Sequence, residues 1–229
     1  MANARTAGYG CRQTMTVGNT PATGGQSEFL VQGGAAPGAT VAIFKGSPVA
    51  MQTAAAPGQL GFIQDASALA MTDTIQGGVA WSHARANTNK VLGIFNGATF
   101  VDASGKPSWT NGLIAAQTSS TDYNTGNNNI TAFVNTNPAQ EYTVRADAAL
   151  TNASFNTITN TGFNLNSVGA GVSGMSDSTL NLNGVATTGV ANYMWKIVRS
   201  ANIENQKDFT VAGADVVVSY NPQANQYQA

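Results

Sequence analysis

The chain has 229 residues, with ten Lys and Arg against eleven Asp and Glu and a formal net charge of −1. Charged residues make up only 9% of it, against roughly 25% in an average soluble protein, so the chain lacks a basic field that would attract nucleic acid. A hydrophobic content of 42% argues against intrinsic disorder and is sufficient for a sizeable core.

The first 27 residues are polar, rich in glycine and without a helix or strand period. They predict an extended N-terminal arm, residues 1–27, in front of a single β-rich domain, residues 28–229. Such an arm is either flexible or laid against a partner, and removing residues 1–26 is expected to leave a folded body.

Three short strands are predicted next, in EFLVQ (28–32), TVAIFKG (40–46) and GSPVAMQ (46–52). The Lys-Gly-Ser between the last two resembles part of a phosphate-binding loop. However, such a loop needs its lysine after the glycine and a helix behind it, whereas here Pro48 follows at once. We therefore predict a bend between two strands.

Residues 64–81 allow either a short helix or a long loop. The segments NKVLGIFNG and ATFVD (89–102) predict a hairpin with Asn96-Gly97 at its tip, because that dipeptide favours a tight turn. Another turn is predicted at Gly105-Lys106-Pro107, and a long polar loop or insertion at about residues 110–129.

The clearest strands are predicted in NITAFVN (129–135), QEYTVRADA (140–148), STLNLNG (178–184), NYMWKIVRSANI (192–203) and ADVVVSYNPQ (214–223). The fourth of these would also suit a short helix. Alternation places Tyr142, Val144 and Ala146 on one face of their strand. Roughly nine to twelve short strands, with turns about ten residues apart, predict an all-β barrel or sandwich.

Residues that carry chemistry are sparse. The one histidine, His83, has no catalytic partner in its vicinity, and the single Cys11 excludes an intrachain disulfide. The carboxylates that were considered as sugar-cleaving acids or calcium ligands occur singly: Asp65, Asp73, Asp102, Asp122, Glu141, Asp147 and Asp177. We predict no enzyme activity, no catalytic residue, no metal and no cofactor.

The N-terminus has no apolar region typical of a signal peptide, and no run of about 18 apolar residues would span a membrane. The expectation is therefore synthesis in a reducing cytoplasm, with neither nucleic acid nor membrane as a partner.

Five phrases in a fixed order carry a family resemblance: GNTPATGGQSEF (18–29), TVAIFKGSPV (40–49), VLGIFNGATFVD (91–102), NPAQEYTVRADAA (137–149) and ADVVVSYNPQANQY (214–227). Together they resemble the head decoration, or cement, proteins of tailed marine and cyanobacterial bacteriophages. The resemblance implies a β-barrel or β-tulip-like core with an N-terminal arm. It also implies a homotrimer on the capsid exterior of the virion, bound to the major capsid protein after synthesis in the host bacterial cytoplasm.

In that setting the arm is expected to touch the capsid. Arg5 and Arg12 are the expected partners of capsid carboxylates. The full set of predicted contact residues is Asn3, Arg5, Tyr9, Arg12, Thr14, Thr16, Asn19 and Gln26. The alternatives are another virion β-protein (tail tube, fibre or host-glycan adhesin) and, less favoured, a glycan-active enzyme.

Overall fold

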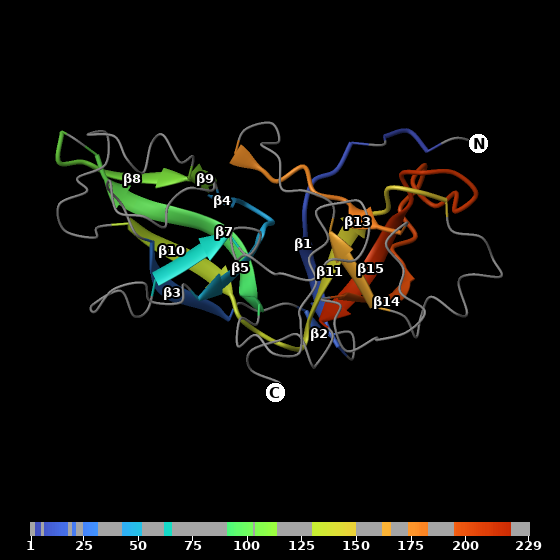
Figure 1. Cartoon of the computed structure of the whole chain (residues 1–229), viewed down its shortest axis with the longest axis horizontal. Helices are drawn as coiled ribbons and strands as arrows, with labels where there is room; N and C mark the ends of the chain where they lie inside the picture. Colours follow the sequence, from blue (N-terminus) through green and yellow to red (C-terminus); the bar gives the residue numbers. More distant parts are fainter. Residues whose placement is uncertain are drawn as a thin grey trace, which may run out of the picture.

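The computed structural model describes residues 3–5, 7–17, 20–21, 25–31, 43–51, 62–65, 91–102, 104–113, 130–149, 162–165, 174–182 and 195–220. These ranges contain fifteen strands and no α-helix, which confirms the predicted all-β fold. Figure 1 shows two bodies side by side, a barrel-like one and a second, strongly twisted sheet. His83, Asn19 and most of residues 64–81 and 110–129 lie outside the described residues.

The first body is a ring of strands. It consists of β3 (Gln26–Val31), β6 (Phe62–Asp65), β5 (Pro48–Met51), β7 (Val91–Val101) and β10 (Ile130–Asn135). Because β10 pairs with both β3 and β7, hydrogen bonds close these five strands into a ring. Strand β8 (Pro107–Thr110) pairs antiparallel with the C-terminal part of β7. Closing a sheet in this way removes exposed strand edges. The prediction of a barrel-like core is thus confirmed.

The second body is an antiparallel sheet in the order β13-β12-β14-β15-β11-β1-β2. Its strands are β1 (Arg12–Thr16), β2 (Thr20–Pro21), β11 (Gln140–Arg145), β12 (Gly162–Leu165), β13 (Leu180–Asn181), β14 (Trp195–Ser200) and β15 (Asp215–Tyr220). A third, two-stranded sheet joins β4 (Ile43–Phe44) to β9 (Gly112–Leu113). In the segment NYMWKIVRSANI, for which the sequence allowed a strand or a short helix, residues 195–200 form the strand β14.

Two apolar clusters fill these bodies. The interior of the barrel holds residues such as Phe95, Leu92 and Ile63. The other cluster lies on the seven-stranded sheet around Trp195, whose ring stacks on Tyr220 with centroids 4.7 Å apart. Residues from the barrel strands β5 and β7 also belong to this second cluster, so the outer face of the barrel packs against the sheet. Tyr142, Val144 and Ala146 all lie in it, as the alternation predicts.

The described residues of the predicted N-terminal arm are packed into the seven-stranded sheet instead of extending away from it. Strand β1 is hydrogen-bonded between β11 and β2, and Tyr9 and Cys11 are buried. Glycine serves close packing here: a Cβ on Gly8 would lie 1.9 Å from the carbonyl oxygen of Asp177. The glycine-rich composition that predicts an extended arm therefore allows two backbones to pack closely here. Consequently the expectation that removing residues 1–26 leaves an intact body does not fit this structure.

The hairpin predicted at Asn96-Gly97 is wrong. Strand β7 runs through both residues without turning, and its register with β10 shifts at this point, which makes Asn96 the extra residue of a β-bulge. Gly97 has a φ of 133°, and a Cβ on it would lie 2.2 Å from the Trp109 ring. The glycine thus serves the bulge and the tryptophan contact. The hairpin tip lies between β7 and β8: Gly105 and Lys106 of the predicted turn are in it, whereas Pro107 already pairs with Val101 as the first residue of β8.

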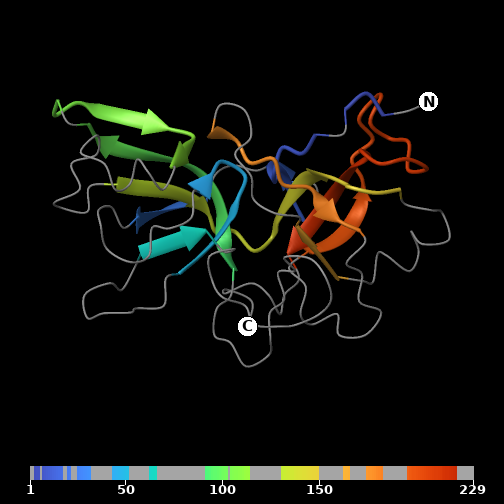
Figure 2. The same ribbon diagram turned by 45° about the horizontal axis from the view of Figure 1, so that its top comes forward.

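The Lys-Gly-Ser bend is confirmed as a corner between strands. The Ser47 N–H donates to the Phe44 carbonyl at 2.8 Å, and Gly46, with a φ of 91°, takes the position that a type II turn reserves for glycine. Gly46 also donates to the Phe95 carbonyl and accepts from the Cys11 N–H. The backbone N–H groups of Lys45, Gly46 and Ser47 are therefore all used within the chain, and in Figure 2 this segment lies between the two bodies.

Candidate functional site

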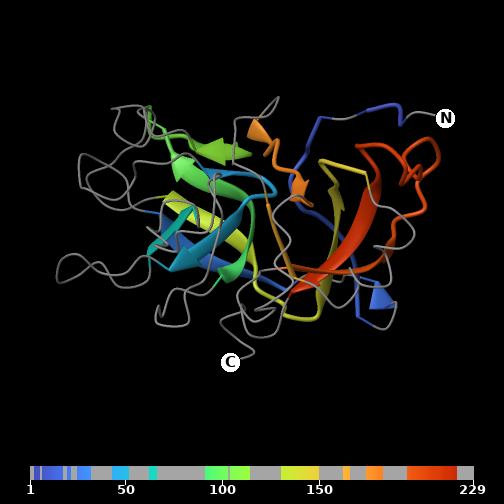
Figure 3. The same ribbon diagram turned by 45° about the vertical axis from the view of Figure 1, so that its right-hand side comes forward.

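The N-terminal segment and residues 203–206 enclose a groove of about 480 Å³, which we call the arm groove. Arg5, Tyr9, Arg12 and Thr14 line one side of it, and the ends of β11 and β15 form its floor. Figure 3 shows the N-terminal segment running beside the loop that follows β14. The Ala4 N–H donates to the Asn205 carbonyl at 3.0 Å, which fixes the two walls to each other.

Tyr9 is the centre of the groove wall. The Arg12 guanidinium lies 4.2 Å from the centroid of its ring and the Arg145 guanidinium 4.8 Å, which gives two cation–π contacts. Burial, followed by the neighbouring Asp215 carboxylate, raises the pKa of the Tyr9 hydroxyl well above its usual value. The phenol therefore stays neutral and holds Arg12 at the rim of the groove.

The floor contains a buried ion pair. Arg145 Nε donates to Asp215 Oδ1 at 3.0 Å and its Nη2 to Oδ2 at 3.2 Å, a two-pronged arrangement with both side chains almost fully buried. Arg145 Nη1 also donates to the Ala7 carbonyl at 2.6 Å. The pair thus anchors the N-terminal segment to the sheet, since one guanidinium serves β15 and residue 7 together.

The charges that remain open to solvent are on the rim. Arg5 and Arg12 are exposed, and within the described residues neither forms an ion pair. Glu204 is exposed on the opposite wall, next to Ile203, which is 42% exposed. The arm groove therefore offers a partner two arginines, one carboxylate and an apolar side chain.

Four of the predicted contact residues, Arg5, Tyr9, Arg12 and Thr14, come together in the arm groove. Asn3 does not line the groove, and its amide Nδ2 donates to the carbonyls of Asp208 and Ala212. The remaining predicted residues do not line it: Thr16 lies farther along β1, Gln26 is exposed on the barrel strand β3, and Asn19 is outside the described residues.

Sequence reasoning did not find Arg145 and Asp215 as part of this site. Alternation along QEYTVRADA places Arg145 on the other face of the strand from Tyr142. The local sequence does not identify its partner Asp215, which lies 70 residues away. The one available signal is that a charged residue in each of two strongly apolar strands needs a counter-charge if both faces are covered.

The other chemical candidates are dispersed. Cys11 is buried in the core of the seven-stranded sheet, and burial raises the pKa of its thiol. Among the described residues, no three His, Cys, Asp or Glu side chains gather as a metal site would require. Glu141 lies 2.6 Å from Arg199 in an ion pair, and Asp102 caps the β7–β8 turn by accepting from the Ser104 and Lys106 N–H groups. Over the same residues there is no helix of the length and apolarity needed to cross a bilayer.

Comparison with known proteins adds no relative. None of the known family models matches the chain, and neither a curated protein nor a solved structure is significantly similar to it. The resemblance to phage decoration proteins consequently stays a prediction.

Proposed function

We propose that this protein is a capsid decoration protein of a tailed bacteriophage. In this role it binds the outside of the expanded head as a homotrimer and bridges neighbouring major capsid subunits. Binding only the mature lattice stabilises that lattice by mass action, without any chemical step. The proposal needs no cofactor and assigns no catalytic residue.

The observation that carries the proposal is the arm groove. Protein interfaces concentrate their binding energy in arginine and aromatic side chains surrounded by apolar contacts. Arg12 stacked on Tyr9, with Arg5 and exposed Ile203 beside them, has this composition. Two exposed arginines against the single Glu204 favour an acidic segment of a capsid subunit as the occupant.

Two exposed apolar side chains follow the groove residues in the sequence. Met15 on β1 is 43% exposed and Val17, just beyond its end, is 60% exposed. A shallow surface of this kind is weak in a single copy. On a shell that presents the same site many times, a trimer held at several points gains avidity without new contacts.

Replacing Arg5 and Arg12 together by Gln is expected to weaken binding to expanded phage heads. The expected loss is about tenfold per arginine, corresponding to about 1.4 kcal/mol each, as for a moderate interface hot spot. Fold stability should change little, because both side chains are exposed. Cosedimentation of the purified protein with heads stripped of decoration measures the effect.

The matched control replaces Lys106 and Lys207 by Gln, which changes the net charge equally at two exposed positions outside the groove. Its binding should equal that of the unaltered protein. Equal binding by both double variants would remove the arm groove from the capsid interface.

A further inference from the structure

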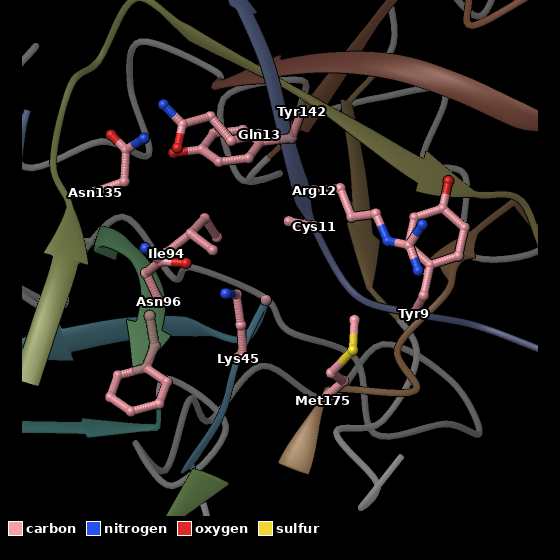
Figure 4. A pocket seen from close by; sticks show the side chains of 12 residues that line it. Tyr9, Cys11, Arg12, Gln13, Lys45, Ile94, Asn96, Asn135, Tyr142 and Met175 are labelled. Carbon is pink, nitrogen blue, oxygen red and sulfur yellow. The ribbon is translucent and has the colours of Figure 1, made fainter. Parts of the chain in front are cut away.

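A second cavity, of about 260 Å³, lies between the barrel and the seven-stranded sheet; we call it the inter-sheet cavity (Figure 4). Its polar lining includes Arg12 and Gln13 of β1, Lys45 of the β4–β5 corner, Asn96 of β7, Asn135 of β10 and Tyr142 of β11. Figure 4 shows Tyr9 and Arg12 on one side, Asn135 on the other and Lys45 between them. Its volume is just below the roughly 300–1,000 Å³ of typical ligand sites, so an occupant must be small.

The charges around this cavity have one sign. Of the residues that the structure describes, Arg12 and Lys45 line it and no Asp or Glu does. Lys45 forms no ion pair within the described part of the chain, although its backbone N–H is held by the carbonyls of Asn111 and Gly174. Two cationic side chains on the lining of one cavity favour an anion as its occupant.

The hydroxyl of Tyr142 offers a further donor. It accepts from the Tyr220 hydroxyl at 3.4 Å, so its own hydrogen is left to point elsewhere. Burial raises the pKa of Tyr142 well above its usual value, and the phenol therefore keeps that hydrogen. The rest of the wall is apolar, with Ile94 and Met175 among its residues.

We infer that the inter-sheet cavity binds a small organic monocarboxylate. Lys45 and Arg12 neutralise its carboxylate, and its apolar body packs on Ile94 and Met175. Such a ligand contacts both bodies of the protein and so stabilises their packing, because it binds only the folded chain. The inference does not depend on capsid binding: Arg12 lines both the cavity and the arm groove, but Lys45 lines the cavity alone.

The test uses benzoate as the probe, benzamide as its uncharged analogue, and inorganic phosphate as an anion without an apolar body. Isothermal titration and thermal unfolding of the full chain are expected to show saturable benzoate binding with a raised Tm. Benzamide and phosphate should bind at least about tenfold more weakly, because each lacks one of the two required parts. Equal effects of benzoate and benzamide on the unaltered protein, or no saturable benzoate binding, would overturn the inference.

A variant locates the site. Lys45→Met keeps the length of the side chain and the backbone hydrogen bonds but removes the ammonium. It should raise the Kd for benzoate at least about tenfold, whereas Lys106→Met, the same change in an exposed turn, should leave the Kd unchanged. Equal losses in the two variants would mean that the anion does not bind at the cavity. Lys45→Met should still bind phage heads, so a failure of the capsid proposal and a failure of this inference are distinguishable.

Discussion

A chain that begins at residue 17 is expected to lose its cooperative unfolding transition. The truncation removes β1, whose register with β11 pairs Gln13 with Tyr142 and Arg12 with Thr143. It also removes the buried side chains of Tyr9 and Cys11. Each side chain of this kind contributes roughly 1.5–3 kcal/mol by burial. Together with the lost backbone hydrogen bonds, the sum approaches the total stability of about 5–15 kcal/mol of a typical domain.

Urea unfolding followed by circular dichroism measures this effect. A synthetic peptide of residues 1–16, added in excess, should restore the transition, because an edge left unpaired on β11 can accept the missing strand. The full chain with Arg5 and Arg12 replaced by Gln is the control and should unfold as the unaltered protein does. A truncated chain that unfolds at the same urea concentration would show that the segment is a dispensable arm, as its composition alone implies.

The second large effect is expected at the floor of the arm groove. Asp215→Ala should destabilise the protein by about 3–5 kcal/mol, because it leaves the buried Arg145 guanidinium without its counter-charge. The loss should also release the N-terminal segment, since the same guanidinium holds the Ala7 carbonyl and the Tyr9 ring.

The free energy of unfolding, from urea titration, checks this prediction. Glu28→Ala is the control: Glu28 is an exposed carboxylate on β3, and its loss should cost less than about 0.5 kcal/mol. Hydrogen exchange provides a second reading, with faster exchange expected at the Gly10 and Cys11 amides. If Asp215→Ala and Glu28→Ala are equally stable, the ion pair does not hold the segment.

Local sequence patterns predict most of the sheet correctly. QEYTVRADA alternates strongly, and the face assigned to Tyr142, Val144 and Ala146 is the one that packs in the core. The error at Asn96-Gly97 has a tertiary cause. Both edges of β7 have partners, β5 and β8 on one and β10 on the other, so continuing the strand gains more hydrogen bonds than the turn that the dipeptide favours locally.

The candidate site was only half predictable. Polarity and position in the chain select Arg5 and Arg12, which are exposed in the structure. The glycines around Tyr9 predict an extended arm, whereas in the structure they allow close backbone packing. Glycine permits flexibility in one setting and close backbone contact in another. Arg145 and Asp215 meet only through the pairing of β11 with β15, which no local pattern reveals.

The most direct test of the proposed role is to find where the protein lies in intact particles. Quantitative mass spectrometry of dissected virions, combined with cryo-electron microscopy of the heads, should find hundreds of copies as trimeric density outside the capsid shell. The N-terminal side of each copy should face a capsid subunit. A few tens of copies on the tail would indicate an adhesin or tube protein instead, and heads that carry none of this protein would contradict the account.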